Sequence, residues 1–125
     1  MYLPPKGSMH VHQYKRTADD MINFAQVIMQ DVPVRSLPCV CTDLNDRLGM
    51  QCVSRDQWIP SCEFDSTIGN VSFEKEAYAG KSMREFASSK FLTAVNTHFD
   101  AGATDFGNNG HKSRIDFLWV RIGII

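Results

Sequence analysis

The stretch from Leu37 to Gly49 constrains the possible folds more than any other part of this sequence. It opens with the apolar run Leu37–Cys41, which predicts a short buried strand, and passes directly into loop-forming residues that include Asp43, Asn45 and Gly49. Open α/β sheets bind ligands in the crevice outside the carboxyl ends of their strands. This strand end is therefore a candidate site, although an Asp-x-Asn at a strand end is more often an ordinary turn or helix cap.

Asp43 and Asn45 have complementary chemistry. They are two residues apart, so in extended backbone both side chains would point the same way. A carboxylate accepts a proton, and a carboxamide donates a hydrogen bond without carrying charge. This combination suits an anionic substrate.

The length of 125 residues limits the chain to one domain with a modest core. No apolar run approaches the roughly 18 residues of a membrane span, and Met1–Lys6 lacks the pattern of a signal peptide. We therefore expect an intracellular protein, cytoplasmic or nuclear, with no membrane partner. The net charge of -1 does not exclude a nucleic-acid partner, because a bound metal can supply local positive charge.

The clearest helix is expected over Thr17–Gln30, where apolar residues recur at helical spacing and Thr17 can cap the first turn. The residue before Pro33 avoids helical geometry, which predicts the end of this helix. A second helix is expected over Lys81–Lys90. The predicted apolar stripe of the first helix is Met21, Phe24, Ala25, Ile28 and Met29, and that of the second is Met83, Phe86 and Ala87.

Strands are expected at Phe91–Val95 and Arg114–Val120, in addition to Leu37–Cys41. Met50–Ala79 shows no sustained period, and a segment this long is usually a functional loop or a sign of wrongly assigned elements. The alternation of strands and helices predicts an α/β fold.

Asp116 lies inside the last of these apolar strands. A buried carboxylate is costly unless it is paired or hydrogen-bonded. One interpretation is a structural pair with Arg114, His98 or His111. The other is a carboxylate that orients a catalytic base, and spacing alone does not decide between them.

The cysteines and the H-x-H pair are weaker metal signals. Cys39, Cys41, Cys52 and Cys62 do not form the paired C-x-x-C of a zinc ribbon, so we expect small buried residues and loop thiols. Cys39 and Cys41 would share one face of their strand. His10 and His12 lie among polar residues without an acidic or cysteine neighbour, so a metal site there is the less expected reading.

Four stretches, taken in order, resemble the endonuclease/exonuclease/phosphatase superfamily. The closest resemblance is to the endonuclease domain that accompanies the reverse transcriptase of non-long-terminal-repeat retrotransposons. The stretches are Tyr2-Leu3-Pro4-Pro5, Thr42-Asp43-Leu44-Asn45-Asp46-Arg47-Leu48-Gly49, Phe86-Ala87 through Asn96-Thr97-His98-Phe99, and Ser113-Arg114-Ile115-Asp116-Phe117.

The resemblance implies two packed sheets with helices outside, and Mg²⁺-dependent hydrolysis of phosphoesters. It implies that Asp43 activates or orients the attacking water and contacts the metal indirectly. Asn45 would hydrogen-bond the phosphate, and Asp116 would orient a catalytic histidine. Residues 1–125 would then form a single partial domain, the C-terminal half of that fold, truncated at both ends.

Departures from the family pattern limit the expected activity. The family's early Asn, its metal-binding Glu and its final Ser-Asp-His have no counterpart in these residues, and neither His98 nor His111 matches the catalytic histidine. Thr42 and Asp46 also replace smaller residues. We expect a fragment of a Mg²⁺-dependent endonuclease that is inactive alone. The alternative is a non-catalytic retroelement remnant or interaction module that associates through exposed sheet edges.

Overall fold

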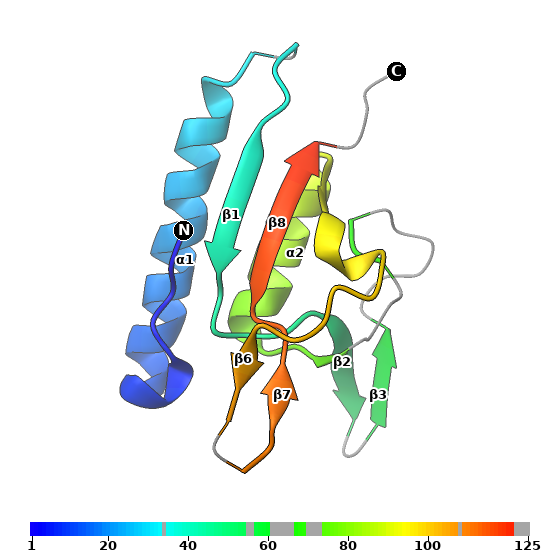
Figure 1. Ribbon diagram of the computed structural model, residues 1–125. Helices are drawn as coiled ribbons and strands as arrows, with labels where there is room; N and C mark the ends of the chain where they lie inside the picture. The colour runs from blue at the N-terminus through cyan, green and yellow to red at the C-terminus, as the bar shows by residue number, and fades with distance from the viewer. Residues whose placement is uncertain (34, 55–56, 61–66, 70–73, 108, 122–125) are drawn as a thin grey trace.

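The structure is a computed structural model that describes residues 1–33, 35–54, 57–60, 67–69, 74–107 and 109–121. Within these residues the chain is a mixed α/β structure with several small sheets (Figure 1). The helical elements are η1 (Lys6–Ser8), α1 (Val11–Gln30), α2 (Tyr78–Ser89) and η2 (Val95–Thr97). The strands are β1 (Cys39–Asp43), β2 (Gly49–Ser54), β3 (Gln57–Pro60), β4 (Glu74–Lys75), β5 (Leu92–Ala94), β6 (Asp105–Phe106), β7 (Lys112–Ser113) and β8 (Asp116–Arg121).

The central sheet has the order β1-β8-β5, with both pairs antiparallel. Its longest ladder joins β1 to β8, from Cys39 opposite Val120 to Asp43 opposite Asp116. Isolated parallel bridges extend the sheet at both sides, Tyr2 beside Asp43 and Ile68 beside Ala94. The first and last parts of the described chain therefore meet in one sheet.

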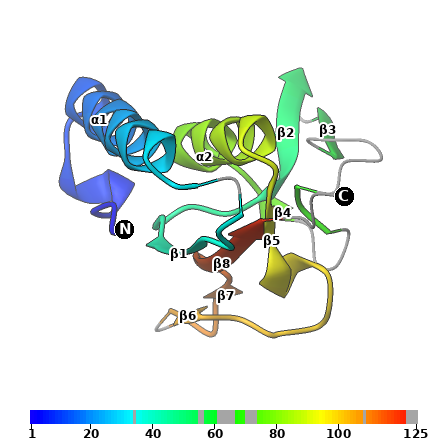
Figure 2. The ribbon, with the colours of Figure 1, turned by 90° about the horizontal axis from the view of Figure 1, so that it is seen from above.

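The two long helices cover one face of this sheet (Figure 2). The core lies between these layers, and Trp119, on the helix side of β8, is fully buried within it. On the opposite side lie η2 and the β6–β7 hairpin. The buried residues of the main core are Ile22, Ala25, Met29, Leu44, Leu48, Ile68, Met83, Phe86, Ala87, Leu92, Ala94, Phe117 and Trp119.

Helix α1 differs from its prediction at its start and in its buried face. It begins at Val11, with His10 as the N-cap, so the prediction that Thr17 caps it is wrong. Thr17 lies inside the helix and its hydroxyl donates to the Gln13 carbonyl (2.8 Å). The expected stripe is also wrong in part, because Phe24 and Ile28 are exposed. The face that packs inward carries Tyr14, Ala18, Ile22, Ala25 and Met29.

Strand β1 begins two residues later than predicted, and the apolar run Leu37–Cys41 is not buried as a whole. Leu37 is 80% exposed, and Cys39 and Cys41 are exposed as well. The expectation of buried cysteines fails here because the inward face of β1 carries Val40 and Thr42 instead. The side chain of Cys52 and the whole of Cys62 lie outside the described residues.

The expectation of an irregular segment at Met50–Ala79 is wrong in part. Strands β2 and β3 pair antiparallel, and β2 also pairs parallel with β4. The β2–β3 register shifts between Cys52 and Ser54, so the strand carries no clean alternation for the sequence to reveal. Helix α2 and strands β5 and β8 overlap their predicted ranges, although α2 begins at Tyr78 rather than Lys81 and β8 begins at Asp116 rather than Arg114. Met83, Phe86 and Ala87 are buried as expected.

In the described part of the chain, neither helix has the length and apolar character that crossing a membrane requires.

Candidate functional site

Asp43 and Asp116 lie directly opposite each other in the β1–β8 ladder. They are far apart in sequence, and the antiparallel pairing brings the end of β1 against the start of β8 (Figure 1). Directly opposed residues in such a ladder have Cβ atoms roughly 4.5–5.5 Å apart. Two of the predicted site residues are therefore neighbours.

This pair belongs to the sheet face that points away from the long helices. The adjacent residues Thr42 and Phe117 are buried on the helix side, and successive side chains of a strand alternate between faces. Asp43 and Asp116 are both half-buried. One oxygen, Oδ1 of Asp43, accepts a hydrogen bond from the Asn45 backbone nitrogen (3.1 Å).

Asn45 does not extend the strand. Its φ of 45° is left-handed, so the argument that extended backbone points Asn45 and Asp43 the same way does not apply. Its Nδ2 donates to the Leu3 carbonyl (2.7 Å), which ties the N-terminal segment to the loop after β1. Asparagine tolerates this backbone conformation better than most residues.

The carboxylate of Asp116 has none of the three structural partners that its sequence context suggested, within the described residues. The guanidinium of Arg114 donates to the Asn96 carbonyl (2.7 Å), and burial lowers the pKa of Arg114. Nε2 of His98 lies 2.7 Å from the Thr93 hydroxyl. The ion pair observed in this part of the chain is elsewhere, between Arg84 and Glu76.

Asn96 and Thr104 hold the start of β8, a role that the sequence did not reveal. Asn96 donates through Nδ2 to the Asp116 carbonyl (2.9 Å) and accepts through Oδ1 from the Leu118 nitrogen (3.3 Å). The Thr104 hydroxyl oxygen accepts from the nitrogens of Ile115 and Asp116. Asn96 belongs to one of the stretches that carry the family resemblance, which was its only signal.

Asp46, three residues after Asp43, is buried and fully engaged. Its carboxylate accepts hydrogen bonds from the backbone nitrogens of Arg47 (2.8 Å), Ala77 (3.1 Å) and Gly80 (2.7 Å). Burial raises the pKa of Asp46, and these N–H groups offset that rise in part. The carboxylate stabilises the first turn of α2, where backbone N–H groups need acceptors.

Glu76 and Arg84 extend this buried polar network. Nη2 of Arg84 lies 3.0 Å from Oε1 of Glu76, and Nε of Arg84 donates to the same oxygen (3.1 Å). The other carboxylate oxygen accepts from the Gly49 nitrogen (3.3 Å). Gly80 fits between these groups because a Cβ there would lie 2.3 Å from the Arg47 carbonyl oxygen.

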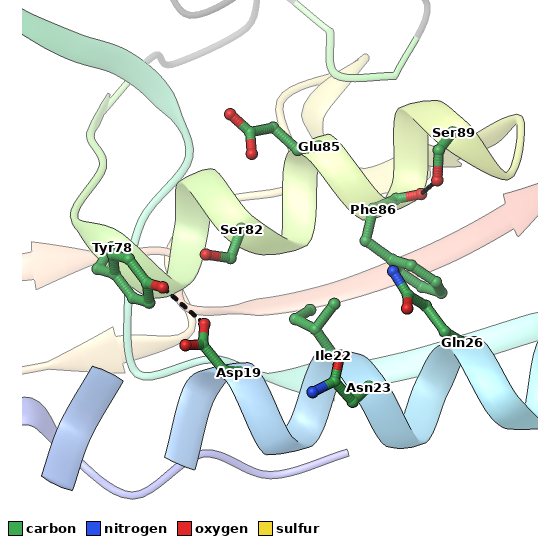
Figure 3. A pocket seen from close by; sticks show the side chains of 9 residues that line it. All are labelled: Asp19, Ile22, Asn23, Gln26, Tyr78, Ser82, Glu85, Phe86 and Ser89. Carbon is green, nitrogen blue, oxygen red and sulfur yellow. Dashed lines mark hydrogen bonds between the residues drawn. The ribbon is translucent and has the colours of Figure 1, made fainter. Parts of the chain in front are cut away.

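A groove of about 590 Å³ runs between α1 and α2, in the helical layer (Figure 3). The Tyr78 hydroxyl donates to Asp19 across it (2.6 Å), and this hydrogen bond is the largest cause of a raised Tyr78 pKa. Ile22 and Phe86 contribute apolar surface, and the other lining residues are Asn23, Gln26, Ser82, Glu85 and Ser89. The groove is thus formed by the helices, whereas Asp43 and Asp116 face away from them.

The described residues contain no group of three or more His, Cys, Asp or Glu arranged to hold a metal. His10 and His12 are engaged with each other, since Nδ1 of His10 accepts from the His12 backbone nitrogen (3.4 Å). Asp43 and Asp116 offer two neighbouring carboxylates, and Mg²⁺ is often held by one or two carboxylates with waters and substrate phosphates completing its shell. This donor set fits Mg²⁺ better than any soft metal.

A scan against protein-family models gives no match, and searches of curated proteins and of solved structures likewise return no similar protein.

Proposed function

We propose that this chain contributes part of the site of a Mg²⁺-dependent phosphodiester hydrolase, an endonuclease of the endonuclease/exonuclease/phosphatase type found in retroelements. The observation that carries the proposal is the direct opposition of Asp43 and Asp116 at one end of the central sheet. Both are half-buried carboxylates without an ion-pair partner among the described residues. Oδ1 of Asp43 accepts a hydrogen bond from the Asn45 backbone nitrogen, as in an ordinary turn, and Oδ2 has no hydrogen-bond partner among the described residues. Partly unsatisfied acids of this kind are candidates for chemistry.

In this proposal Asp43 would position the attacking water and help to hold Mg²⁺. A bound Mg²⁺ would stabilise the charge that develops on the phosphate oxygens. By the resemblance Asp116 would orient a histidine base, as carboxylates do for imidazoles in other hydrolases, although neither His98 nor His111 matches that histidine. Asn45 keeps one amide hydrogen for a phosphate oxygen, because its Nδ2 carries two hydrogens and Leu3 uses one.

The proposed fold is a two-sheet sandwich, with Asp43 and Asp116 at one end of the central sheet. The family's metal-binding Glu and its catalytic histidine have no counterpart among the 125 residues. The proposed partner is nucleic acid. We expect this polypeptide alone to bind Mg²⁺ weakly and to leave supercoiled plasmid uncut.

The experiment is a titration with Mn²⁺, which stands in for Mg²⁺ and broadens the NMR signals of nearby amides. We expect selective broadening at Asp43, Asn45 and Asp116, reversed by excess Mg²⁺. Asp43→Asn combined with Asp116→Asn should abolish it, whereas the matched pair Asp19→Asn and Asp105→Asn should leave it unchanged. If the broadening persists in the Asp43→Asn/Asp116→Asn variant, the proposed metal site is wrong. If the chain nicks plasmid and Asp43→Ala abolishes the nicking, the chain holds a complete active site.

A second candidate is a non-catalytic interaction module. It is favoured by large apolar side chains that are exposed, among them Leu37 (80%), Phe91 (66%) and Phe106 (67%). Such surfaces and open strand edges promote pairing between chains. Size-exclusion chromatography that shows a stable monomer at all concentrations would count against this candidate.

A further inference from the structure

Cys39 and Cys41 form an exposed pair of thiols on one side of β1. Both are free and exposed in the structure. They are two residues apart in a strand, so their side chains leave the same face of the sheet. Their cross-strand partners on β8 are Val120 and Leu118, which offer no competing charge.

The strand geometry favours a bridging atom over a direct bond between the sulfurs. Residues two apart in a strand are separated by roughly 6.7 Å, and their Cβ atoms leave the sheet side by side. A disulfide needs Cβ atoms only about 3.5–4.5 Å apart, so it would require β1 to leave its ladder with β8. A metal that joins two sulfurs, with bonds near the roughly 2.3 Å of a zinc thiolate, spans about 4.6 Å and needs no such movement.

The number of ligands selects the kind of metal. Structural zinc takes four ligands, and the described residues place no third His, Cys, Asp or Glu with this pair. Thiolates select soft ions, of which Cu(I) accepts two sulfur ligands in a nearly linear arrangement.

We propose that Cys39 and Cys41 form a two-coordinate site for a soft monovalent metal ion of the Cu(I) class. Binding replaces two S–H bonds by two metal–sulfur bonds and releases two protons, so it strengthens as the pH rises. Cys41 is two residues before Asp43 on the same face of β1, so this site adjoins the one proposed at Asp43 and Asp116. The two differ in ligand type, because hard and soft ions use different ligands.

The test is anaerobic competition for Cu(I) with the coloured chelator bicinchoninate, using the whole chain. We expect the chain to withdraw one Cu(I) from the chelator. Cys39→Ser and Cys41→Ser should each weaken binding about 100-fold, because the second thiolate binds intramolecularly only when both are present. The double variant Cys52→Ser/Cys62→Ser is the matched control and should keep the wild-type affinity.

Retention of wild-type affinity in Cys39→Ser, or its loss in Cys52→Ser/Cys62→Ser, would overturn the site. A second measurement is the reaction of the thiols with a water-soluble maleimide, mapped by mass spectrometry. Both Cys39 and Cys41 should react in the native chain and be protected by Cu(I). Slow labelling of both cysteines would mean that they are covered, and would also overturn the Cu(I) site. The Mg²⁺ site proposed at Asp43 and Asp116 is tested separately, by the Mn²⁺ titration.

Discussion

Asp43 ends strand β1 and Asp46 lies three residues later in the loop that follows, yet their surroundings are opposite. Asp46 is buried and accepts three backbone N–H groups, beside a second buried carboxylate, Glu76, that is paired with Arg84. Asp43 is half-buried, accepts one backbone N–H, and faces the like charge of Asp116 across the sheet. The first set holds the start of α2 in place, whereas the second has one side-chain hydrogen bond, from the Asn45 nitrogen to Asp43, among the described residues.

The difference shows that two carboxylates of one short motif can be held in very different surroundings. A carboxylate that accepts several buried backbone N–H groups is costly to remove, because those N–H groups are then left buried without a hydrogen-bond partner. A carboxylate left partly unsatisfied is available to water, metal or substrate. Substitutions in the two sets should therefore differ sharply in their effect on stability.

The largest effect is expected from Arg84→Met. This change leaves Glu76 buried with a charge that no guanidinium balances, and removal of one partner of a buried ion pair typically costs about 3–5 kcal/mol. Urea unfolding followed by tryptophan fluorescence measures the free energy of unfolding.

Glu76→Gln combined with Arg84→Met is the control for this prediction. It removes the unbalanced charge and should recover part of the loss. If Arg84→Met lowers the free energy of unfolding by less than about 1 kcal/mol, the Arg84–Glu76 pair contributes no more than an exposed ion pair. The two sets of carboxylates would then not differ in their effect on stability.

An intermediate effect, with a specific pH dependence, is expected at Asp46. The pKa of this acid is raised from 3.8 in the folded chain, so the folded state binds the proton more tightly than the unfolded state. The Asp46 contribution to the free energy of unfolding should then fall as the pH rises from 3.8 through the raised pKa, and be constant above it. Asp46→Asn removes this titration.

Parallel urea titrations of wild type and Asp46→Asn from acid to neutral pH test the sign. The stability of wild type relative to Asp46→Asn should decrease as the pH rises. An increase instead would mean that the N–H groups of Arg47, Ala77 and Gly80 outweigh burial and favour the carboxylate.

The sequence predicted an element best where its large apolar side chains are also the ones that pack into the core. Helix α2 and strands β5 and β8 were predictable because Met83, Phe86, Ala87 and the apolar run around Trp119 meet the core directly. Helix α1 was predictable as a helix but not in its buried face. The packing surface includes Ala18 and Tyr14, and a search for large apolar residues selects Phe24 and Ile28 instead.

The site was predictable in its acids and not in their partners. Asp43 followed from its position after a predicted strand, and Asp116 from its position inside an apolar one. Only the β1–β8 register reveals that they are opposite each other. Asp46 looked like one more turn residue. Its role depends on Ala77 and Gly80, about thirty residues later, and no local pattern reports such a contact.

The smallest effect on stability is expected at Asp43 and Asp116 themselves. Asparagine at position 43 can still accept the Asn45 N–H through its side-chain oxygen, and either substitution removes a repulsion between opposed like charges. Each of Asp43→Asn and Asp116→Asn should change the free energy of unfolding by less than about 0.5 kcal/mol, in the stabilising direction.

A double-mutant cycle at low and high salt measures the interaction between these two acids. We expect a repulsive coupling of about 0.2–1 kcal/mol that shrinks as salt is added, because screening weakens charges near the surface. If either single variant lowers the free energy of unfolding by more than about 1 kcal/mol, that acid stabilises the fold, as Asp46 does. A small repulsive coupling would instead mean that the fold tolerates this pair at a cost, which is the energetic pattern of groups positioned for a ligand rather than for folding.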